Sequence, residues 1–192
     1  MIESLDRSVG KTMAAIKRLG LGKNTFVFFC SDNGGYLNYR GGFENISSNG
    51  VLRGQKTQVY EGGHRVPAIA WWPDRIKPGV SHHTAATFDL FPTLTALAKA
   101  EEPARLDGIN LAPILFAQES LEPRTLFWRM GDSRAVRQGR WKLIAEGNKP
   151  AALYNLKNDI GEKLDLAASR LVLTEKLSET LRKWEMEMDR GF

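Results

Sequence analysis

Apolar residues near the start of the chain recur at the spacing of an amphipathic helix. They lie three or four positions apart with mostly polar residues between them: Ile2, Leu5, Val9, Met13, Ile16 and Leu19. Glycines at positions 20 and 22 then predict the end of this helix. Residues 25–30 (TFVFFC) follow as an apolar run with no polar alternation, which predicts a strand covered on both faces, as in a parallel sheet. Residues 68–72 (AIAWW) form a second such run.

The pattern changes beyond Pro103, where short strand candidates replace the longer apolar runs. The candidates are residues 126–129, 134–137, 140–144 and 153–154. Gly131-Asp132 and Gln138-Gly139 supply turn residues between the first three, which indicates an antiparallel meander. Apolar positions from Val172 to Met188 then return to helical spacing. We expect this last helix to lie on one face of the meander.

These patterns together predict an α/β protein with two parts. Residues 1–103 are expected to form part of a larger α/β sheet with its helices. Residues 104–192 are expected to form a carboxyl-terminal α+β subdomain, a small antiparallel four-stranded sheet packed on a C-terminal helix. A length of 192 residues allows one domain or one domain with a subdomain.

Composition and charge narrow the classes of partner. The net charge is +5, from 27 basic and 22 acidic residues, which suits an acidic small-molecule substrate. No run of five or six like charges and no basic stripe interleaved with aromatics occurs, so no nucleic-acid partner is predicted. No apolar run approaches the eighteen or so residues of a membrane span, and the segment after Met1 does not resemble a signal peptide, so no membrane partner is predicted either. Cys30 is the only cysteine, which excludes an internal disulfide.

Asp32 and Asn33 are candidate metal ligands. They come just after the first buried strand, at the end where open α/β sheets place their ligands. A carboxylate and an amide carbonyl are hard oxygen donors, which suit calcium or magnesium better than zinc. Asp-Asn-Gly-Gly is also favourable turn chemistry, so a plain turn is the alternative interpretation.

Lys56 is a candidate for binding a tetrahedral anion. It precedes the segment Tyr-Glu-Gly-Gly-His-Arg at residues 60–65, and its ammonium could contact sulfate or phosphate oxygens as a point charge. His64 and Arg65 lie in the same neighbourhood and are further candidates for contact with substrate. The alternatives are a solvated basic loop for Lys56 and a structural pair for Glu61 and Arg65.

Six blocks of the chain resemble, in order, the type I, arylsulfatase-like sulfatases of the alkaline-phosphatase superfamily. The first blocks are the Leu-Asp … Val-Gly helix start, the strand that ends in Ser-Asp-Asn-Gly and the Leu-Arg-Gly-x-Lys … Glu-Gly-Gly-x-Arg-Val-Pro segment. The later blocks are Asp-Leu-Phe-Pro-Thr-Leu, Asp-Gly and the Val-Arg … Trp-Lys-Leu meander with its Leu-Tyr-Asn-Leu. The resemblance implies the carboxyl-terminal portion of such an enzyme, with part of an alkaline-phosphatase-like sheet.

The resemblance also implies roles for the candidate residues. Asp32 and Asn33 match two ligands of a calcium ion, and Lys56 matches a lysine that binds the sulfate group. In the family a formylglycine, made from the cysteine of a Cys-x-Pro-x-Arg motif, attacks the sulfur. That motif is absent here, and Cys30 is followed by Ser-Asp-Asn. We therefore expect a sulfuric ester hydrolase fragment with no catalytic nucleophile and no formylglycine, inactive alone, whose partial calcium site is weak or empty.

The sequence leaves two alternative functions open and also predicts the kinds of partner. The chain could be a non-enzymatic remnant that binds an anionic partner through Lys56 and Arg65, or part of a phosphomonoester or phosphonate hydrolase of the same superfamily. A sulfate ester is the expected substrate of the complete enzyme. Apolar strands left uncovered predict a homo-oligomer or association with a missing N-terminal half. Family members are mostly periplasmic, secreted or lysosomal, so the compartment of this chain stays open.

Overall fold

The computed structural model describes residues 2–39, 43–44, 46–101, 103–117 and 119–190. The chain divides into two compact units, and each takes two segments of sequence. Unit 1 is Met1–Cys30 with Ala68–Leu121, and unit 2 is Ser31–Pro67 with Glu122–Phe192. This division differs from the boundary at residue 103 that the sequence suggests, because Arg53, Val59, Tyr60 and Glu61 contact the carboxyl-terminal sheet.

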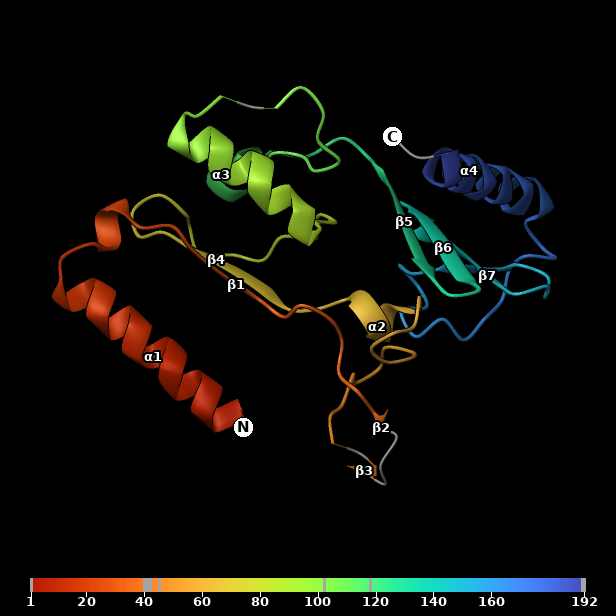
Figure 1. The fold of residues 1–192 in the computed structure, drawn as a ribbon, viewed down its shortest axis with the longest axis horizontal. Coiled ribbons are helices and arrows are strands. Elements are labelled where there is room, and N and C mark those ends of the chain that lie inside the picture. The colour runs from red at the N-terminus through yellow and green to blue at the C-terminus, as the bar shows by residue number, and fades with distance from the viewer. Residues whose placement is uncertain (1, 40–42, 45, 102, 118, 191–192) are drawn as a thin grey trace. The chain divides into compact units, whose positions relative to one another are not determined.

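Unit 1 contains helices and one strand pair. Its elements are α1 (Ile2–Arg18), η1 (Gly22–Asn24), β1 (Val27–Cys30), β4 (Ala68–Trp71), η2 (Thr87–Asp89), α3 (Leu90–Ala98) and the π-helical turn η3 (Pro113–Ala117) (Figure 1). The predicted helix and both predicted strands are present. The expected parallel arrangement is wrong for the described residues, because β1 and β4 pair with each other antiparallel, Val27 opposite Trp71. Neither strand is covered on both faces: β1 is half-buried and β4 begins exposed.

Unit 2 is built on the predicted meander. Its elements are β2 (Asn38–Tyr39), β3 (Phe43–Glu44), α2 (Glu61–His64), β5 (Thr125–Met130), β6 (Ser133–Gln138), β7 (Trp141–Glu146), β8 (Ala152–Asn155) and α4 (Leu171–Arg190). Strands β5 to β8 form an antiparallel sheet in chain order. Gly131 and Gly139 each begin a two-residue hairpin with positive φ, 55° and 57°, which glycine adopts without steric cost.

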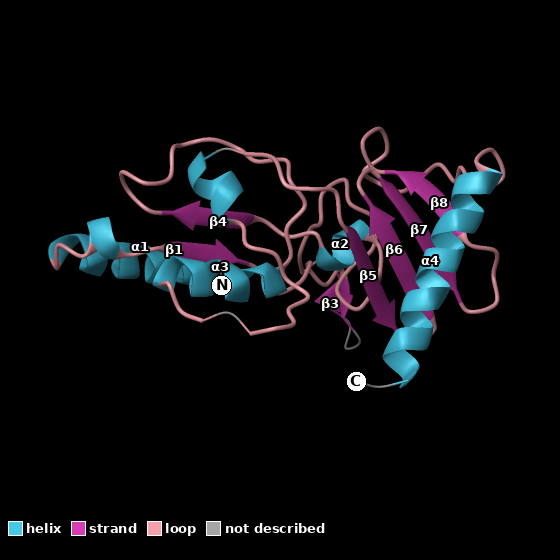
Figure 2. Cartoon of the chain, turned by 90° about the horizontal axis from the view of Figure 1, so that it is seen from above, coloured by secondary structure: helices cyan, strands magenta, loops and turns pink. Residues whose placement is uncertain are grey.

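One face of this sheet packs against α4. Val136, Leu143 and Leu153 are fully buried there against Leu177 and Leu181 of the helix. Figure 2 shows α4 lying across the strands. Each buried leucine contributes about 1.5–3 kcal/mol relative to an exposed one. The expectation that the last helix covers one face of the meander is confirmed.

The opposite face packs against the segment that leads into α2. Ala135, Ile144 and Tyr154 alternate with the residues of the helix face, as the period of two in a strand requires. They form a core with Val59 and Tyr60, which directly precede α2. The segment that carries the candidate site is therefore packed on the second face of the carboxyl-terminal sheet.

Candidate functional site

Backbone hydrogen bonds join the Asp32-Asn33 segment to the segment that carries Lys56. The N–H of Gly34 donates to the carbonyl oxygen of Gly63 at 3.0 Å, and the N–H of Lys56 donates to the carbonyl oxygen of Gly35 at 3.2 Å. The candidate metal ligands and the candidate anion-binding residue thus belong to one hydrogen-bonded framework, although more than twenty residues separate them in sequence.

Three glycines allow these backbones to approach so closely. A Cβ atom added at Gly34 would lie within 3.0 Å of the Gly62 backbone, one at Gly62 within 3.0 Å of the Arg53 carbonyl, and one at Gly63 within 3.0 Å of the Gln58 carbonyl. The N–H of Gly62 also donates to the Arg53 carbonyl oxygen at 2.7 Å. Any side chain at these positions would push the two segments apart.

Two amide side chains reinforce the framework. The Oδ1 of Asn49 accepts from the N–H of Gly35 at 2.8 Å, and its Nδ2 donates to the carbonyl oxygens of Gly35 and Gly54 at 3.1 and 2.9 Å. The Oε1 of Gln55 accepts from the N–H of Leu37 at 2.8 Å. These bonds replace the regular secondary structure that a glycine-rich loop lacks.

Asp32 and Asn33 form a local turn and still present oxygen atoms. The Oδ1 of Asp32 accepts from the N–H of Asn33 at 3.0 Å, and the Nδ2 of Asn33 donates to the carbonyl oxygen of Gly34 at 3.1 Å. The Oδ2 of Asp32 and the Oδ1 of Asn33 make no hydrogen bond with any described residue. These two oxygens fit the donor chemistry of calcium, but a tight calcium site needs six or more. Across the described chain no group of three or more His, Cys, Asp and Glu could hold a metal ion.

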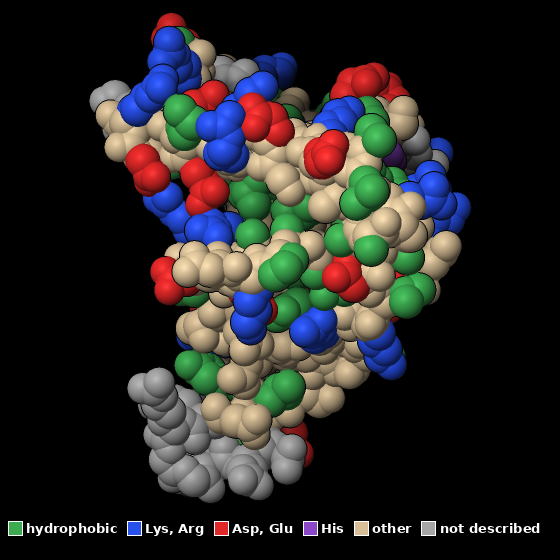
Figure 3. Space-filling model, turned by 90° about the vertical axis from the view of Figure 1, so that its right-hand side faces the viewer, with side chains coloured by type: hydrophobic (Ala, Val, Ile, Leu, Met, Phe, Trp, Pro, Cys, Tyr) green, Lys and Arg blue, Asp and Glu red, His purple; other side chains and the backbone are tan. Residues whose placement is uncertain are grey.

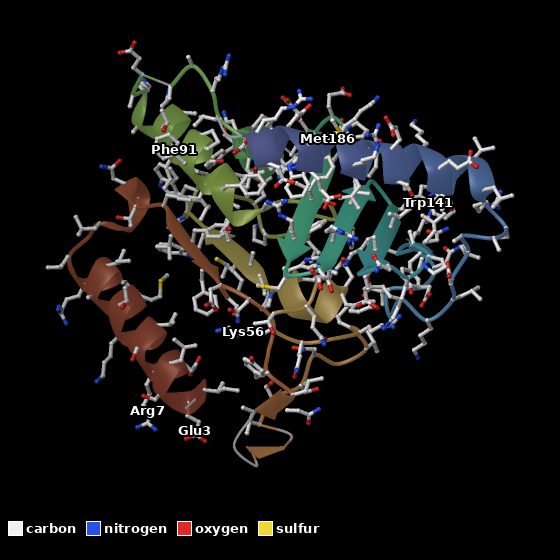
Figure 4. The ribbon with its side chains drawn as sticks, turned by 45° about the vertical axis from the view of Figure 1, so that its right-hand side comes forward. Glu3, Arg7, Lys56, Phe91, Trp141 and Met186 are labelled. Atoms are coloured by element: carbon white, nitrogen blue, oxygen red, sulfur yellow. The ribbon has the colours of Figure 1, made fainter. Side chains whose placement is uncertain are left out.

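Lys56 lies on the loop that leads into α2, where Figure 4 labels it. Its side chain is half-buried and forms no ion pair with any residue that the structure describes. The next residue, Thr57, has a φ of 71°, which is unusual for a β-branched residue, and its hydroxyl donates to the carbonyl oxygen of Lys56. The backbone is therefore strained at Thr57, directly after Lys56.

A buried ionic cluster lies at the end of the same loop. Glu61, Lys142 and Glu162 are each fully buried. The Nζ of Lys142 is 2.9 Å from the Oε1 of Glu61 and 2.9 Å from the Oε1 of Glu162. Burial alone would raise the pKa of the Glu61 carboxyl, but the charge and hydrogen bond of Lys142 outweigh it and lower this pKa. At Glu162 burial outweighs the same cation, so the pKa of that carboxyl is raised.

His64 and Arg65, the two further candidates, both contact this cluster. The Nε2 of His64 is 3.1 Å from the Nζ of Lys142, and its ring stacks on Trp128 at 4.2 Å between centroids. Burial and the nearby ammonium lower the pKa of His64 to about 4, so the ring is neutral near pH 7. Arg65 donates to the Oε2 of Glu61 at 3.1 Å, which is the structural pair expected from the sequence. A substrate contact by either residue stays a prediction.

The sequence offered little sign of Lys142 and Glu162. Lys142 is one charge inside an apolar strand, and Glu162 is one of several acids in a charged connection. A lysine between Trp141 and Leu143 on a strand with both faces covered was the available signal, because such a charge needs a buried partner. The partners come from positions 61 and 162, which only tertiary contact identifies.

Comparisons with known proteins identify the family. The family model described as Sulfatase matches residues 1–100. Arylsulfatase A of Homo sapiens is 34% identical over 213 residues, which cover 95% of this chain and 41% of that protein. N-acetylgalactosamine-6-sulfatase of Mus musculus is 39% identical over 147 residues, which cover 73% and 27% of the two chains. The crystal structure of Ps i-CgsB matches with a TM-score of 0.81 and 33% identity, over 96% of this chain and 41% of that one.

The chain belongs to the sulfatase family of hydrolases and covers part of the alkaline-phosphatase-like α/β fold of these enzymes. It spans about two fifths of the length of arylsulfatase A. Sulfatases generally depend on calcium. The resemblance given by the six sequence blocks is thereby confirmed at the level of family and fold.

Two further observations concern possible partners. Among the described helices, none has the length and apolar character needed to cross a membrane. On the face drawn in Figure 3, Lys and Arg side chains are interspersed with Asp and Glu side chains.

Proposed function

We propose that this chain supplies the calcium-and-sulfate part of a sulfuric ester hydrolase site. Asp32 and Asn33 provide two oxygen ligands to calcium, and Lys56 contacts a sulfate oxygen of a sulfate ester. Calcium, when bound, would withdraw charge from the sulfate oxygens. The Lys56 ammonium would stabilise negative charge that develops there during transfer.

The observation that carries this proposal is the hydrogen-bonded framework between the two segments. The bond from Lys56 to Gly35 holds the backbone of the lysine to the segment that follows Asp32 and Asn33. A cationic side chain without a described ion-pair partner on that framework is what an anion site requires. Family membership supports the class of ester, and the hydrogen bond between Lys56 and Gly35 supports a shared site for these residues.

Sulfate binding provides the direct test. Sodium sulfate should shift the backbone amide signals of Lys56 and Thr57 in an NMR titration, relative to sodium chloride at equal ionic strength. Lys56→Met should abolish the shifts, whereas the control Lys157→Met, at an exposed position, should keep them. Equal shifts in both variants would contradict the role of Lys56.

We further propose that the isolated chain does not turn over sulfate esters and binds calcium weakly. Its single cysteine, Cys30, is not part of a Cys-x-Pro-x-Arg motif. A fluorogenic aryl sulfate should therefore show no hydrolysis above buffer, and a calorimetric calcium titration should give a Kd weaker than about 1 µM. Hydrolysis of the sulfate ester would refute the first statement, and a submicromolar Kd the second. Hydrolysis of the matching phosphate ester would favour the phosphomonoesterase alternative.

We also propose that unit 1 associates with other polypeptide, either the N-terminal half of a sulfatase or a second copy of this chain. Large apolar side chains are exposed on α1, β4 and α3, among them Ile2 at 84%, Ile69 at 60% and Phe91 at 54%. Exposed apolar surface of this extent is typical of an interface. Size-exclusion chromatography with light scattering should show association, and a clean monomer at all concentrations would refute it.

A further inference from the structure

We infer that Glu162 and Lys142 are positioning residues that hold Lys56 in place through the face of the carboxyl-terminal sheet that packs against Val59 and Tyr60. The inference rests on the proposed function of Lys56 as an anion contact. It concerns contacts within unit 2, between the loop 53–65 and the segments of β7 and residue 162.

Glu162 binds both ends of the loop that carries Lys56. Its carbonyl oxygen accepts from the Nη1 of Arg53 at 2.8 Å, and its Oε2 accepts from the backbone N–H of Glu61 at 2.8 Å. Arg53 lies three residues before Lys56, and Glu61 lies five residues after it. One residue therefore fixes both ends of a short loop.

A cross-strand row of the sheet completes the attachment. Arg137, Lys142 and Tyr154 are register partners on β6, β7 and β8, so their side chains lie on one face. Lys142 contacts Glu61 at 2.9 Å, and Tyr154 accepts a hydrogen bond from Arg53 at 3.1 Å.

The third member of this row, Arg137, approaches the same carboxylate. Its Nη1 is 3.6 Å from the Oε2 of Glu61. The sheet thus meets the loop with polar groups at both loop ends, and the apolar core of Val59 and Tyr60 lies beside them.

Backbone strain at two points indicates that these contacts hold the loop in a conformation that it would not adopt without them. Glu162 has a φ of 51° although it is fully buried and is not glycine, and Thr57 has a φ of 71° directly after Lys56. Each such conformation costs of order 1–3 kcal/mol and persists only where surrounding contacts over-determine it. The hydrogen bonds of Glu162 with Arg53 and Glu61 are the contacts that maintain this strained conformation. Without them the loop would relax at Thr57, and Lys56 would move.

The choice of charged residues supports a positioning role over a purely stabilising one. A buried ion cluster is often no more stabilising than apolar residues of similar volume, because two charges must be desolvated. An apolar cluster would pack the loop without directional bonds. The cluster of Glu61, Lys142 and Glu162 instead specifies one position of α2. Because Gly62 and Gly63 of α2 are hydrogen-bonded to Arg53 and Gly34, that position also fixes these two residues.

Hydrogen–deuterium exchange measured by mass spectrometry on the intact chain tests the inference. Glu162→Gln removes the charge, and Arg53→Gln removes the second anchor without altering the buried cluster. In both variants, peptides covering residues 53–63 should exchange at least tenfold faster, and α4 should be unchanged. The control Glu175→Gln, at an exposed position of α4, should match the parent chain throughout.

Exchange of residues 53–63 at the parent rate in both variants would overturn the inference. Equal acceleration in every peptide, α4 included, would also overturn it, because this marks general destabilisation. If Glu162→Gln does not fold, Arg53→Gln alone decides.

Sulfate titrations separate this inference from the proposed function. Sodium sulfate should slow exchange around Lys56 in the parent chain, and at least threefold more sulfate should be needed in Glu162→Gln. No effect of sulfate on the parent chain would count against the proposed function alone. The exchange rates of the variants without sulfate would still decide the positioning role.

Discussion

Removing the buried ammonium of Lys142 is the most informative perturbation of unit 2. Lys142→Met keeps most of the side-chain volume and leaves Glu61 and Glu162 buried without their shared cation. Each carboxylate lies 2.9 Å from the Nζ, so the gross attraction is about 6 kcal/mol per pair at an effective dielectric of about 20. The variant also lacks the free-energy cost of desolvating the ammonium, and this offsets much of the lost attraction. We expect a net loss of about 3–5 kcal/mol in the free energy of unfolding.

Urea and thermal unfolding of the variant measure this loss. For a chain of this size, about 2–4 °C of Tm corresponds to each kcal/mol, so Tm should fall by roughly 6–20 °C. Lys183→Met, a lysine on α4 that is 67% exposed, is the matched control and should change stability by less than about 0.5 kcal/mol.

The pH dependence gives a second readout of the same variant. Without Lys142 the two carboxyls should titrate at higher pKa than in the unfolded chain. The folded variant would then bind protons more strongly than the unfolded one, so its deficit should shrink as pH falls towards about 4.5. A loss below about 1 kcal/mol at pH 7, or a deficit that grows on acidification, would refute the assignment of a charged buried cluster.

Three other predictions concern the framework, the histidine and the helix. Gly63→Ala should destabilise by about 2 kcal/mol or more in urea unfolding, because its Cβ would collide with the Gln58 carbonyl oxygen. His64 has a pKa of about 4 against about 6.5 when unfolded, so the unfolded chain binds more protons between these values. Stability should therefore fall by up to about 3 kcal/mol from pH 6.5 to 4, and His64→Gln should flatten this profile. Leu177→Ala, fully buried against the sheet, should cost about 2–5 kcal/mol, and the exposed Leu171→Ala far less.

Local pattern was enough to predict α1, β1, β4, the meander of β5 to β8 and α4, but not the short elements β2, β3 and α2. The helical spacing before Gly20, the two apolar runs and the meander after residue 124 all appear where the sequence indicates. These features depend on neighbours within a few residues, through side-chain period and turn chemistry. The direction of strand pairing does not depend on near neighbours in sequence. The sequence led us to expect a parallel sheet, whereas β1 and β4 pair antiparallel.

For the candidate site too, the sequence predicted some features and only the tertiary structure revealed the others. Residue type and order alone marked Asp32, Asn33 and Lys56, and also the pair of Glu61 and Arg65. The attachment of Glu61 to a strand 81 residues further along could not be read from the chain, because Lys142 contacts Glu61 only after the meander has formed.

Sequence by itself determined which side chains are available for metal and anion chemistry, since that depends on residue type. Tertiary structure decided what holds them. A buried charge is stable only beside its partners, and the Glu61 carboxylate finds them in Lys142 on β7 and Arg137 on β6. The strained loop around Lys56 exists because contacts distant in sequence supply the free energy that its own residues lack.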